Sequence, residues 1–364
     1  MKKLILLFGA VSIAILLFAI HTTTETTNTA TIGFFTDLSG PAAPYGEEIL
    51  RGAKLAAQGY ENILIRYEDT QCNPREGITI LQQLRTAHDI RVTGGTVCSS
   101  VAQAIAPLLE GQDMFHLSTG ASSPELTHAG ERFFRVWPSD AAEARILATY
   151  AIKEIGVETA SILYVDTEFS RPLQEIFRQY IQEHEKKILS TESFSSEARD
   201  VRAQLIRIQQ EKPDAIYVIS HPEQIPIILR QIKELGIESK ILSYGPAIQA
   251  HGILEQSGIR AEGVTFAFPK QEESQTFKER YRTQYGTEPG LGASVGYDTM
   301  KLLIEAVEQC GDRNITCIQR YLHAQQERPS ASGTISFDEN GDVVVPAVIM
   351  HIRDGKAEEI QREK

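Results

Sequence analysis

The chain has 364 residues, of which 42% are apolar and 23% are charged. This composition is that of a globular protein with one or two domains, and it excludes a disordered chain, a fibre and a polytopic membrane protein. The chain carries 48 acidic against 36 basic residues, a formal net charge of −12. Because an acidic protein repels nucleic-acid phosphates, no nucleic-acid partner is expected.

The N-terminus has the pattern of an export signal. Lys2 and Lys3 precede an apolar stretch at residues 4–20, which is the pattern of a secretory signal peptide. At ~1.5 Å per residue the stretch is also marginally long enough to anchor the chain in a membrane. We therefore interpret residues 1–20 as a signal peptide or an N-terminal membrane anchor, which predicts an extracytoplasmic protein. Membrane contact is expected only if this segment is not cleaved. The threonine-rich residues 21–30 predict a solvated linker.

After the linker, strand-like and helix-like patterns alternate along the chain. Buried strands are short apolar runs, whereas helices repeat apolar residues every three or four positions. Strands are predicted at residues 31–36, 63–67, 92–97, 114–117, 161–165, 215–219 and 241–244. Helices are predicted at residues 47–58, 74–86, 102–109, 173–181, 201–208 and 225–235. This alternation is typical of parallel βαβ units and predicts an α/β fold, with two lobes and helices on both faces of each sheet.

Four cysteines follow the export signal: Cys72, Cys98, Cys310 and Cys317. An even number in an exported protein favours two disulfides, for which three pairings exist. The proximity of Cys310 to Cys317 favours a bond between them, which leaves Cys72 with Cys98. A metal site is the alternative. It is disfavoured because the chain has no CxxC motif and no histidine at a ligand spacing from these cysteines.

Polar residues follow several predicted strands, at the edge where parallel sheets bind ligands. They lie in residues 37–46, 96–100 and 118–124. Ser99 and Ser122 stand near predicted helix starts, where hydroxyls and unpaired N–H groups suit a carboxylate or another anion. The alternative is that both serines only cap helices, which is the commoner use of such a serine.

Signatures of known enzyme classes are absent from the sequence. It contains no GxSxG, Walker or HExxH motif, and its histidines show no triad or metal spacing. Gly290, Gly292 and Gly296 approach a dinucleotide fingerprint, but the last glycine stands one place late. A loop entering a helix is the preferred interpretation. No enzymatic activity, cofactor or metal is therefore expected.

Seven motifs together resemble one family. They are LSGPAAPYG (38–46), YEDTQCNP (67–74), TVCSS (96–100), STGASSPEL (118–126), FRVWPSD (134–140), SVGYDTMKLL (294–303) and ISFDENGD (335–342). Each is weak alone, but their shared order along the chain is specific. From about residue 31 to about 355 the chain resembles the branched-chain amino-acid binding proteins of ABC importers, the Leu/Ile/Val type of periplasmic binding protein.

The resemblance implies a two-lobed type I periplasmic binding protein fold with three hinge crossings. By analogy these lie near residues 137–140, 266–268 and 328–333. Lobe 1 would comprise residues 31–139 and 268–328, and lobe 2 residues 140–267 and 329–364. The resemblance also implies the Cys72–Cys98 disulfide, a monomer and an ABC permease as partner.

The resemblance further implies a ligand site between the lobes. Ser99 would bind the α-carboxylate of a ligand, and Ser122 its carboxylate and ammonium. Gly120 and Ala121 would present their backbone to the same groups. Tyr45 would line the side-chain pocket from one lobe, and Phe169 would form an aromatic wall from the other.

Two positions depart from the family pattern. Ser220 stands where a tyrosine is expected, and Ala247 stands where the acid that pairs with the ammonium is expected. Burial of an ammonium without a carboxylate is costly. Either Asp140, Glu168 or Glu223 supplies the charge, or the ligand lacks an α-ammonium.

We therefore expect a non-enzymatic protein that captures a small polar ligand, an amino acid or a related amide or carboxylate, by hinge closure. It would deliver that ligand to an ABC permease. The alternative is a membrane-anchored receptor on the same fold that senses a ligand. An amide hydrolase is a third, weaker alternative, because no nucleophile–base pair is found.

Overall fold

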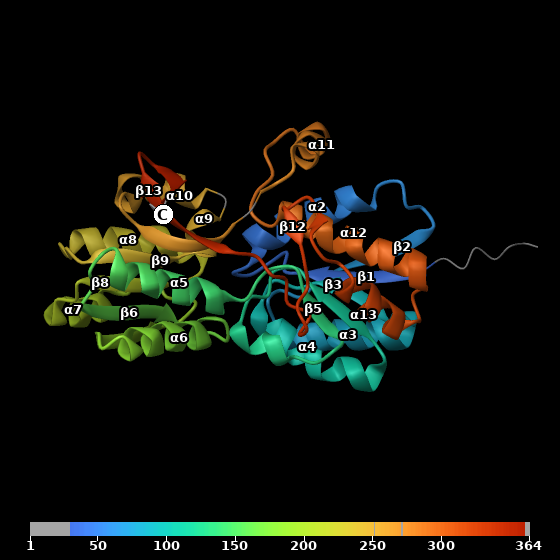
Figure 1. Ribbon diagram of the computed structural model, residues 1–364, viewed down its shortest axis with the longest axis horizontal. Coiled ribbons are helices and arrows are strands. Elements are labelled where there is room, and N and C mark those ends of the chain that lie inside the picture. Colours follow the sequence, from blue (N-terminus) through green and yellow to red (C-terminus); the bar gives the residue numbers. More distant parts are fainter. Residues whose placement is uncertain (1–29, 251, 271, 361–364) are drawn as a thin grey trace, which may run out of the picture.

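The computed structural model describes residues 30–250, 252–270 and 272–360. They form two α/β lobes that lie side by side along the long axis of the molecule (Figure 1). No helix within these residues is long and apolar enough to cross a membrane. The predicted signal peptide or anchor at residues 1–20 lies outside the described residues, as does all but the last residue of the predicted linker.

The first lobe is built on a five-stranded parallel sheet with the order β2-β1-β3-β4-β5. Its strands are β1 (Ala30–Thr36), β2 (Ile63–Asp69), β3 (Val92–Gly95), β4 (Phe115–Ser118) and β5 (Phe133–Arg135). In β1, Ile32 and Phe34 pack on one face of the sheet and Phe35 on the other. The face of Phe35 is covered by α3 (Pro74–His88) and α4 (Ser99–Gln112). The opposite face is covered by α2 (Ala43–Ala57), α12 (Ala293–Cys310) and α13 (Ile315–His323).

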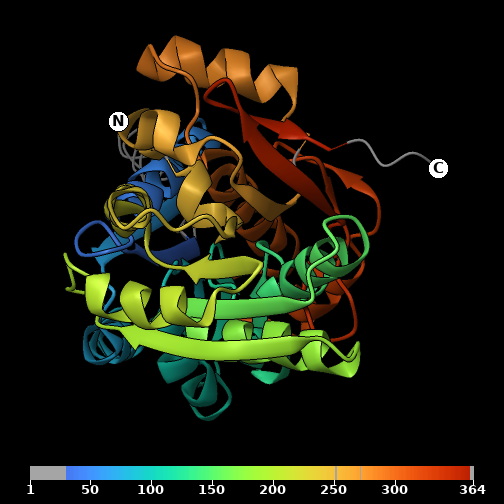
Figure 2. The same ribbon diagram turned by 90° about the vertical axis from the view of Figure 1, so that its left-hand side faces the viewer.

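The second lobe is built on a seven-stranded sheet with the order β14-β13-β10-β9-β8-β6-β7. This lobe faces the viewer in Figure 2, where strands of the sheet run across the picture. Its strands are β6 (Thr159–Val165), β7 (Lys187–Phe194), β8 (Ala215–Ile219), β9 (Lys240–Tyr244), β10 (Thr265–Pro269), β13 (Ala347–Arg353) and β14 (Lys356–Glu359). β13 runs antiparallel to its neighbours, and the other pairs are parallel. Its helices are α5 (Asp140–Lys153), α6 (Ser170–Glu183), α7 (Arg202–Glu211), α8 (Ile225–Glu234), α9 (Gly245–Gln249) and α10 (Ile253–Ser257). The predicted α/β class with mainly parallel sheets is confirmed.

The turn between β3 and α4 differs from the prediction of a strand at 92–97. β3 ends at Gly95, where φ is 105°, and Thr96 follows with φ 57°. A side chain at Gly95 would place its Cβ 2.1 Å from the carbonyl oxygen of Phe35, so only glycine fits. The chain therefore turns sharply, and α4 begins at Ser99 rather than at residue 102.

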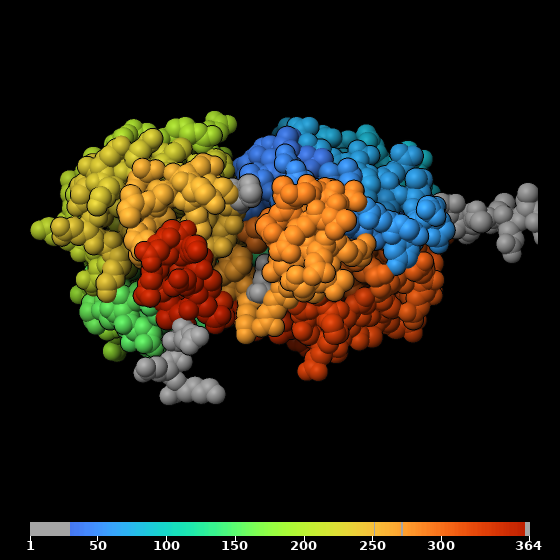
Figure 3. All heavy atoms as spheres, turned by 90° about the horizontal axis from the view of Figure 1, so that it is seen from above, coloured from blue at the N-terminus to red at the C-terminus, as the bar shows by residue number. Residues whose placement is uncertain are grey.

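In the described residues the chain passes between the lobes at three places. The first runs from Trp137, packed in the first lobe, to the start of α5. The second joins β10 to α11 (Gln275–Tyr285), which contacts α2. The third lies between Val343 and β13. The lobes meet along a narrow furrow in the view of Figure 3.

The third passage lies later than the prediction near residues 328–333. A small antiparallel sheet, β11 (Arg328–Pro329) with β12 (Thr334–Ile335), precedes it. Apolar side chains from this region pack into the core of the first lobe: Ile335, Phe337 and Val343. Arg135, fully buried, donates to both carboxylate oxygens of Asp342 at 2.6 Å. Residues 334–343 therefore pack with the first lobe, although the prediction placed 329–364 in the second.

Both expected disulfides are present. Cys72–Cys98 joins the loop after β2 to the residue that precedes α4, and Cys310–Cys317 joins the end of α12 to α13. The Cα atoms are 5.5 and 5.6 Å apart. The pairing left by elimination and implied by the family resemblance is thus the one in the structure.

Asp37, directly after β1, is fully buried and connects these loops. One carboxylate oxygen accepts from the Thr70 hydroxyl and the Cys72 amide. The other accepts from the Val97 and Cys98 amides, each at 2.9 Å. The carboxylate also lies close to both sulfurs of the disulfide. Because the sulfurs are bonded to each other and both carboxylate oxygens are occupied, this cluster is structural and is not a metal site.

The two disulfides should contribute unequally to stability. Their cysteines are 26 and 7 residues apart in sequence, and a longer closed loop restricts the unfolded chain more. The chain-entropy model gives about 3–4 kcal/mol for Cys72–Cys98 and about 2–3 kcal/mol for Cys310–Cys317. Urea unfolding of the Cys72→Ala/Cys98→Ala variant should show the larger loss, with Cys310→Ala/Cys317→Ala as the matched control. A larger loss in the control would contradict this order.

Candidate ligand-binding site

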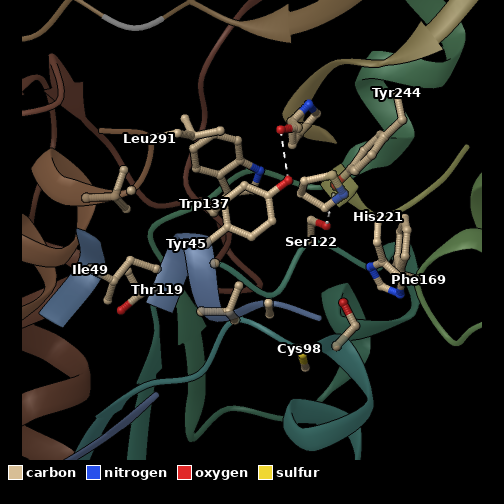
Figure 4. A pocket seen from close by; sticks show the side chains of 18 of the residues that line it. Tyr45, Ile49, Cys98, Thr119, Ser122, Trp137, Phe169, His221, Tyr244 and Leu291 are labelled. Carbon is tan, nitrogen blue, oxygen red and sulfur yellow. Dashed lines mark hydrogen bonds between the residues drawn. The ribbon is translucent and has the colours of Figure 1, made fainter. Parts of the chain in front are cut away.

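A cavity that is partly open to solvent lies between the lobes; about 680 Å³, which includes open solvent, is not filled by protein atoms. Figure 4 shows its lining. The first lobe contributes Ala42, Tyr45, Ile49, Val97, Cys98, Ser99, Thr119, Gly120, Ser122, Trp137, Leu291, Gly292 and Val295. The second lobe contributes Phe169, Ser220, His221, Pro222, Tyr244 and Pro246. The lining is aromatic and apolar with a few hydroxyls, as in many small-molecule sites, and none of these residues is Asp, Glu, Lys or Arg.

The start of α4 forms one polar wall of the cavity. The turn at Gly95 and Thr96 and the bonds to Asp37 place Ser99 as the first residue of this helix. The first amides of a helix have no partner within it and attract anions. The Ser99 Oγ accepts from the Ser123 amide at 3.1 Å, so its own O–H group remains free to donate. This wall therefore offers several donors to an anionic group.

The loop after β4 lies beside the start of α4. Gly120 and Ser122 line the cavity, whereas the side chain of Ala121 is packed in the core of the first lobe. Among the described residues, the amides of Ala121 and Ser122 have no hydrogen-bond partner. The Ser122 hydroxyl donates to Asp140 Oδ2 at 2.6 Å. The Tyr244 hydroxyl lies 3.3 Å from the same Ser122 oxygen. While Asp140 is ionised and accepts from Ser122, the Ser122 oxygen is left to accept from a ligand, which suits the expected contact to an ammonium and not the expected contact to a carboxylate.

Asp140 lies behind this wall rather than in the lining of the cavity. It is fully buried, and Tyr244 of the second lobe donates to its two oxygens at 3.3 and 3.2 Å. Burial raises the pKa of Asp140 to about 7. Glu143, one turn further along α5, is also buried, and its oxygens have no hydrogen-bond partner in the described structure. Burial, and then the charge of Asp140, hold the pKa of Glu143 well above its usual range.

The other two candidate acids also lie outside the cavity lining. Glu168 is exposed, and its Oε1 lies 3.6 Å from Arg171 Nη1. Glu223 is half-buried, and burial raises the pKa of its carboxyl. Ala247, at the position of the expected acid, is buried in the core of the second lobe. The structure therefore places no carboxylate of these residues where it would contact an ammonium.

The second lobe presents an aromatic wall. The ring of Phe169 lies 5.4 Å from that of His221 and 5.3 Å from that of Tyr244. Burial lowers the pKa of His221 to about 4, so the imidazole is neutral at physiological pH. Ser220, next to it, is fully buried. No enzyme motif includes any of these four residues, but the family resemblance pointed to Phe169 and Ser220.

Tyr45 crosses the cavity from the first lobe to the second (Figure 4). Its hydroxyl donates to the Pro246 carbonyl at 2.8 Å. Burial, followed by the charges of Glu223 and Asp140, raises the pKa of Tyr45 well above its ordinary value, so the donor remains protonated. This hydrogen bond joins the two lobes directly.

Several lining residues were missed from the sequence. Trp137 stands in the motif FRVWPSD, yet only its hinge position was considered. Leu291 and Gly292 belong to the loop interpreted as a helix entry, and Gly292 is indeed the N-cap of α12. His221 was set aside because a scattered histidine is more often structural or solvated than catalytic, and Tyr244 was noted only as the end of the strand predicted at 241–244. Their place at the carboxyl ends of parallel strands was the available signal.

Comparisons with known proteins agree with this architecture. Residues 29–357 match the family described as periplasmic binding protein. The chain is 21% identical to Leu/Ile/Val-binding protein homolog 3 of Brucella melitensis over 340 residues, 90% of this chain and 92% of that protein. A leucine-binding protein structure from Thermotoga maritima matches with a TM-score of 0.83 and 24% identity, covering 91% of this chain and 98% of that one.

A second solved structure carries a different ligand. It is a solute-binding protein of an ABC transporter from Rhodopseudomonas palustris in complex with 3,4-dihydroxybenzoic acid. It matches with a TM-score of 0.81 and 22% identity, covering 91% of this chain and 95% of that one. At these identities the structures show a shared fold. The relatives are binding proteins and not enzymes.

Asp140→Asn should change how stability depends on pH. The pKa of Asp140 is raised from 3.8 to about 7 by burial, so between these values the folded protein holds a proton that the unfolded chain has released. The stability from this protonated carboxyl is complete below pH 3.8 and is lost as the pH rises toward 7. The melting temperature, measured between pH 3.8 and 7, should therefore fall less steeply with rising pH in Asp140→Asn than in the wild type. The exposed Glu168→Gln is the control, and an unchanged slope in Asp140→Asn would contradict the raised pKa.

Proposed function

Since this chain belongs to the periplasmic binding protein family, we propose that it binds a small organic acid outside the cytoplasm and delivers it to an ABC permease. The observation that supports this ligand class most directly is the asymmetry of the cavity. Groups that can donate hydrogen bonds to a carboxylate are concentrated at the start of α4 and in the loop after β4. No Asp or Glu side chain lines the cavity.

The carboxylate would lie against the first lobe. The Ser99 hydroxyl and the amides of Ala121 and Ser122 would donate to it, and the N-terminal end of α4 would favour its charge. Hydrogen bonds to a charged group contribute about 1.5–3 kcal/mol each. These donors are present without any basic side chain in the lining.

The body of the ligand would lie between aromatic rings. Tyr45 and Trp137 of the first lobe face Phe169 and Tyr244 of the second across the cavity. An α-ammonium would find no carboxylate in the lining, because Asp140 lies behind the wall, where Ser122 and Tyr244 donate to it. We therefore favour an acid with an apolar or aromatic body over a standard amino acid. The relatives include proteins described as binding leucine and 3,4-dihydroxybenzoic acid, so the family accommodates both kinds of ligand.

Calorimetric titration of the purified protein distinguishes these ligands. We expect 3-phenylpropanoate and 4-methylpentanoate to bind more tightly than phenylalanine and leucine, which differ from them by the α-ammonium. Ser99→Ala should weaken acid binding about 10- to 100-fold, because one hydrogen bond to a charged group is lost. Ser100→Ala, the next residue of α4 and outside the cavity lining, is the matched control. Tight leucine binding, or a Ser99→Ala variant that binds acids normally, would count against the proposed site.

Tyr45→Phe should weaken binding of every ligand by about 2- to 10-fold. The variant loses the inter-lobe hydrogen bond to Pro246, so the closed form becomes less populated. Small-angle X-ray scattering of the unliganded variant should show a larger radius of gyration. Tyr285→Phe is the matched control, since its hydroxyl donates to the Arg51 carbonyl, also at 2.8 Å, within the first lobe. Equal behaviour of the two variants would show that the Tyr45 bond does not hold the lobes together.

A further inference from the structure

The ligand carboxylate would lie next to a carboxyl group of the protein. Asp140 is fully buried, and its Oδ2 lies 2.6 Å from the Ser122 Oγ. Ser122 lines the cavity, and its amide is one of the donors available to the ligand. A ligand oxygen bonded to Ser122 would lie about 5–6 Å from Asp140, because two hydrogen bonds would separate them. Two carboxyl groups this close disfavour each other's ionised form.

No cation is placed to compensate two negative charges here. None of the residues that line the cavity is Lys or Arg. Arg135 lowers the pKa of Asp140, but its guanidinium already donates to both oxygens of Asp342. Glu143 on α5 adds an acid rather than a base, and burial and the charge of Asp140 hold its pKa well above the usual range. The other titratable groups that face Asp140 are tyrosines whose pKa is raised, so they stay protonated: Tyr45, Tyr217 and Tyr244.

The hydrogen bonds decide which of the two carboxyl groups takes up a proton. The ligand would accept from the Ser99 hydroxyl and from the amides of Ala121 and Ser122, beside the N-terminal end of α4. Asp140 accepts from hydroxyls of two side chains, Ser122 and Tyr244. Because hydrogen bonds to a carboxylate favour its ionised form, the better-supplied ligand stays ionised. The proton therefore goes to Asp140.

Protonation of Asp140 also reverses the Ser122 hydroxyl. A protonated Asp140 carries an O–H group that can donate to the Ser122 Oγ. The Ser122 hydroxyl is then free to donate to the ligand carboxylate, while the Tyr244 hydroxyl still lies 3.3 Å from Asp140 Oδ1. The site thus loses a negative charge and gains a donor for a carboxylate in the same step.

We propose that Asp140 determines the ligand class of this cavity, because a carboxylic acid without an ammonium binds together with one proton that Asp140 takes up from water. With Asp140 ionised, the Ser122 oxygen suits an ammonium instead. Asp140 does not line the cavity, so it is a positioning residue that acts through Ser122. The inference rests on the proposed function, since the charge of the ligand carboxylate drives the proton onto Asp140.

Binding of such an acid should weaken as the pH rises. Without ligand the pKa of Asp140 is about 7, so above this pH the carboxyl is mostly ionised and must take up a proton when an acid binds. The charge of the bound ligand raises the pKa of Asp140 further, so the complex keeps this proton. By linkage, one proton taken up per ligand makes the Kd rise about 10-fold for each pH unit above 7.

Calorimetry of the full chain with 4-methylpentanoate counts the proton directly. Titrations at about pH 8 in phosphate and in Tris, whose ionisation enthalpies differ, should show uptake of nearly one proton per ligand. Asp140→Asn has no group to protonate at this position, so it should bind the acid without proton uptake and with a Kd that is independent of pH. Glu143→Gln is the matched control. It replaces the other buried acid of α5, which is already protonated, and should leave the uptake unchanged.

Nuclear magnetic resonance of a ligand labelled at its carboxyl carbon assigns the proton. The chemical shift of the bound ligand should remain that of an ionised carboxylate. This measurement and the wild-type proton count need no variant, so they decide the outcome even if Asp140→Asn does not fold.

Three results would disprove the role of Asp140 while the proposed function stands. They are acid binding without proton uptake, uptake that persists in Asp140→Asn, and a proton found on the ligand itself. If no acid binds to the wild type, the proposed function falls, and this inference falls with it.

Discussion

The buried carboxylate of Asp37 is the interaction on which the binding face of the first lobe depends. It bonds to amides and a hydroxyl from the loops after β2 and β3, and these loops also carry the Cys72–Cys98 disulfide. The backbone carbonyl oxygen of Asp37 would lie 1.8 Å from a Cβ at Gly46. Helix α2 can therefore pack against Asp37 only because Gly46 has no side chain. Tyr45 and Ser99 thus take their positions from one buried residue. A carboxylate satisfied by amides needs no cation, which leaves the neighbouring cavity free of basic side chains.

The contact between the lobes at the cavity depends on a second buried acid. Asp140 begins α5, and its backbone N–H donates to the Ser122 carbonyl at 3.0 Å. Its side chain accepts from Ser122 of the first lobe and from Tyr244 of the second. Separation of the lobes would break this network and the Tyr45–Pro246 bond. Asp140 is buried where the two lobes meet, and this burial is the physical cause of its raised pKa. The first passage of the chain between the lobes and the chemistry of the cavity are connected through this one residue.

The sequence predicted the fold where local patterns are strong. β1, β8 and their neighbours are apolar runs between amphipathic helices, and their order was visible without a structure. β7 was missed because it lies at a sheet edge, where polar residues such as Ser190 and Glu192 interrupt the apolar pattern. The third passage was misplaced because the burial of Asp342 against Arg135 is a contact between residues far apart in sequence. Site residues that follow strands were found, but Trp137 and Leu291 reach the cavity only through tertiary packing.

The polarity of each hydroxyl in the cavity is a further property that no sequence pattern contains. Ser99 and Ser122 look equivalent in sequence, since each stands at the start of a polar loop or helix. In the structure, the Ser123 amide donates to Ser99, which leaves Ser99 a donor, whereas Ser122 donates to Asp140 while that acid is ionised and is then left an acceptor. In that state a carboxylate belongs with the Ser99 hydroxyl and the loop amides, and an N–H or O–H group of the ligand belongs with the Ser122 oxygen. Recognition in this cavity follows from which neighbour each hydroxyl already has, rather than from the presence of the hydroxyl itself.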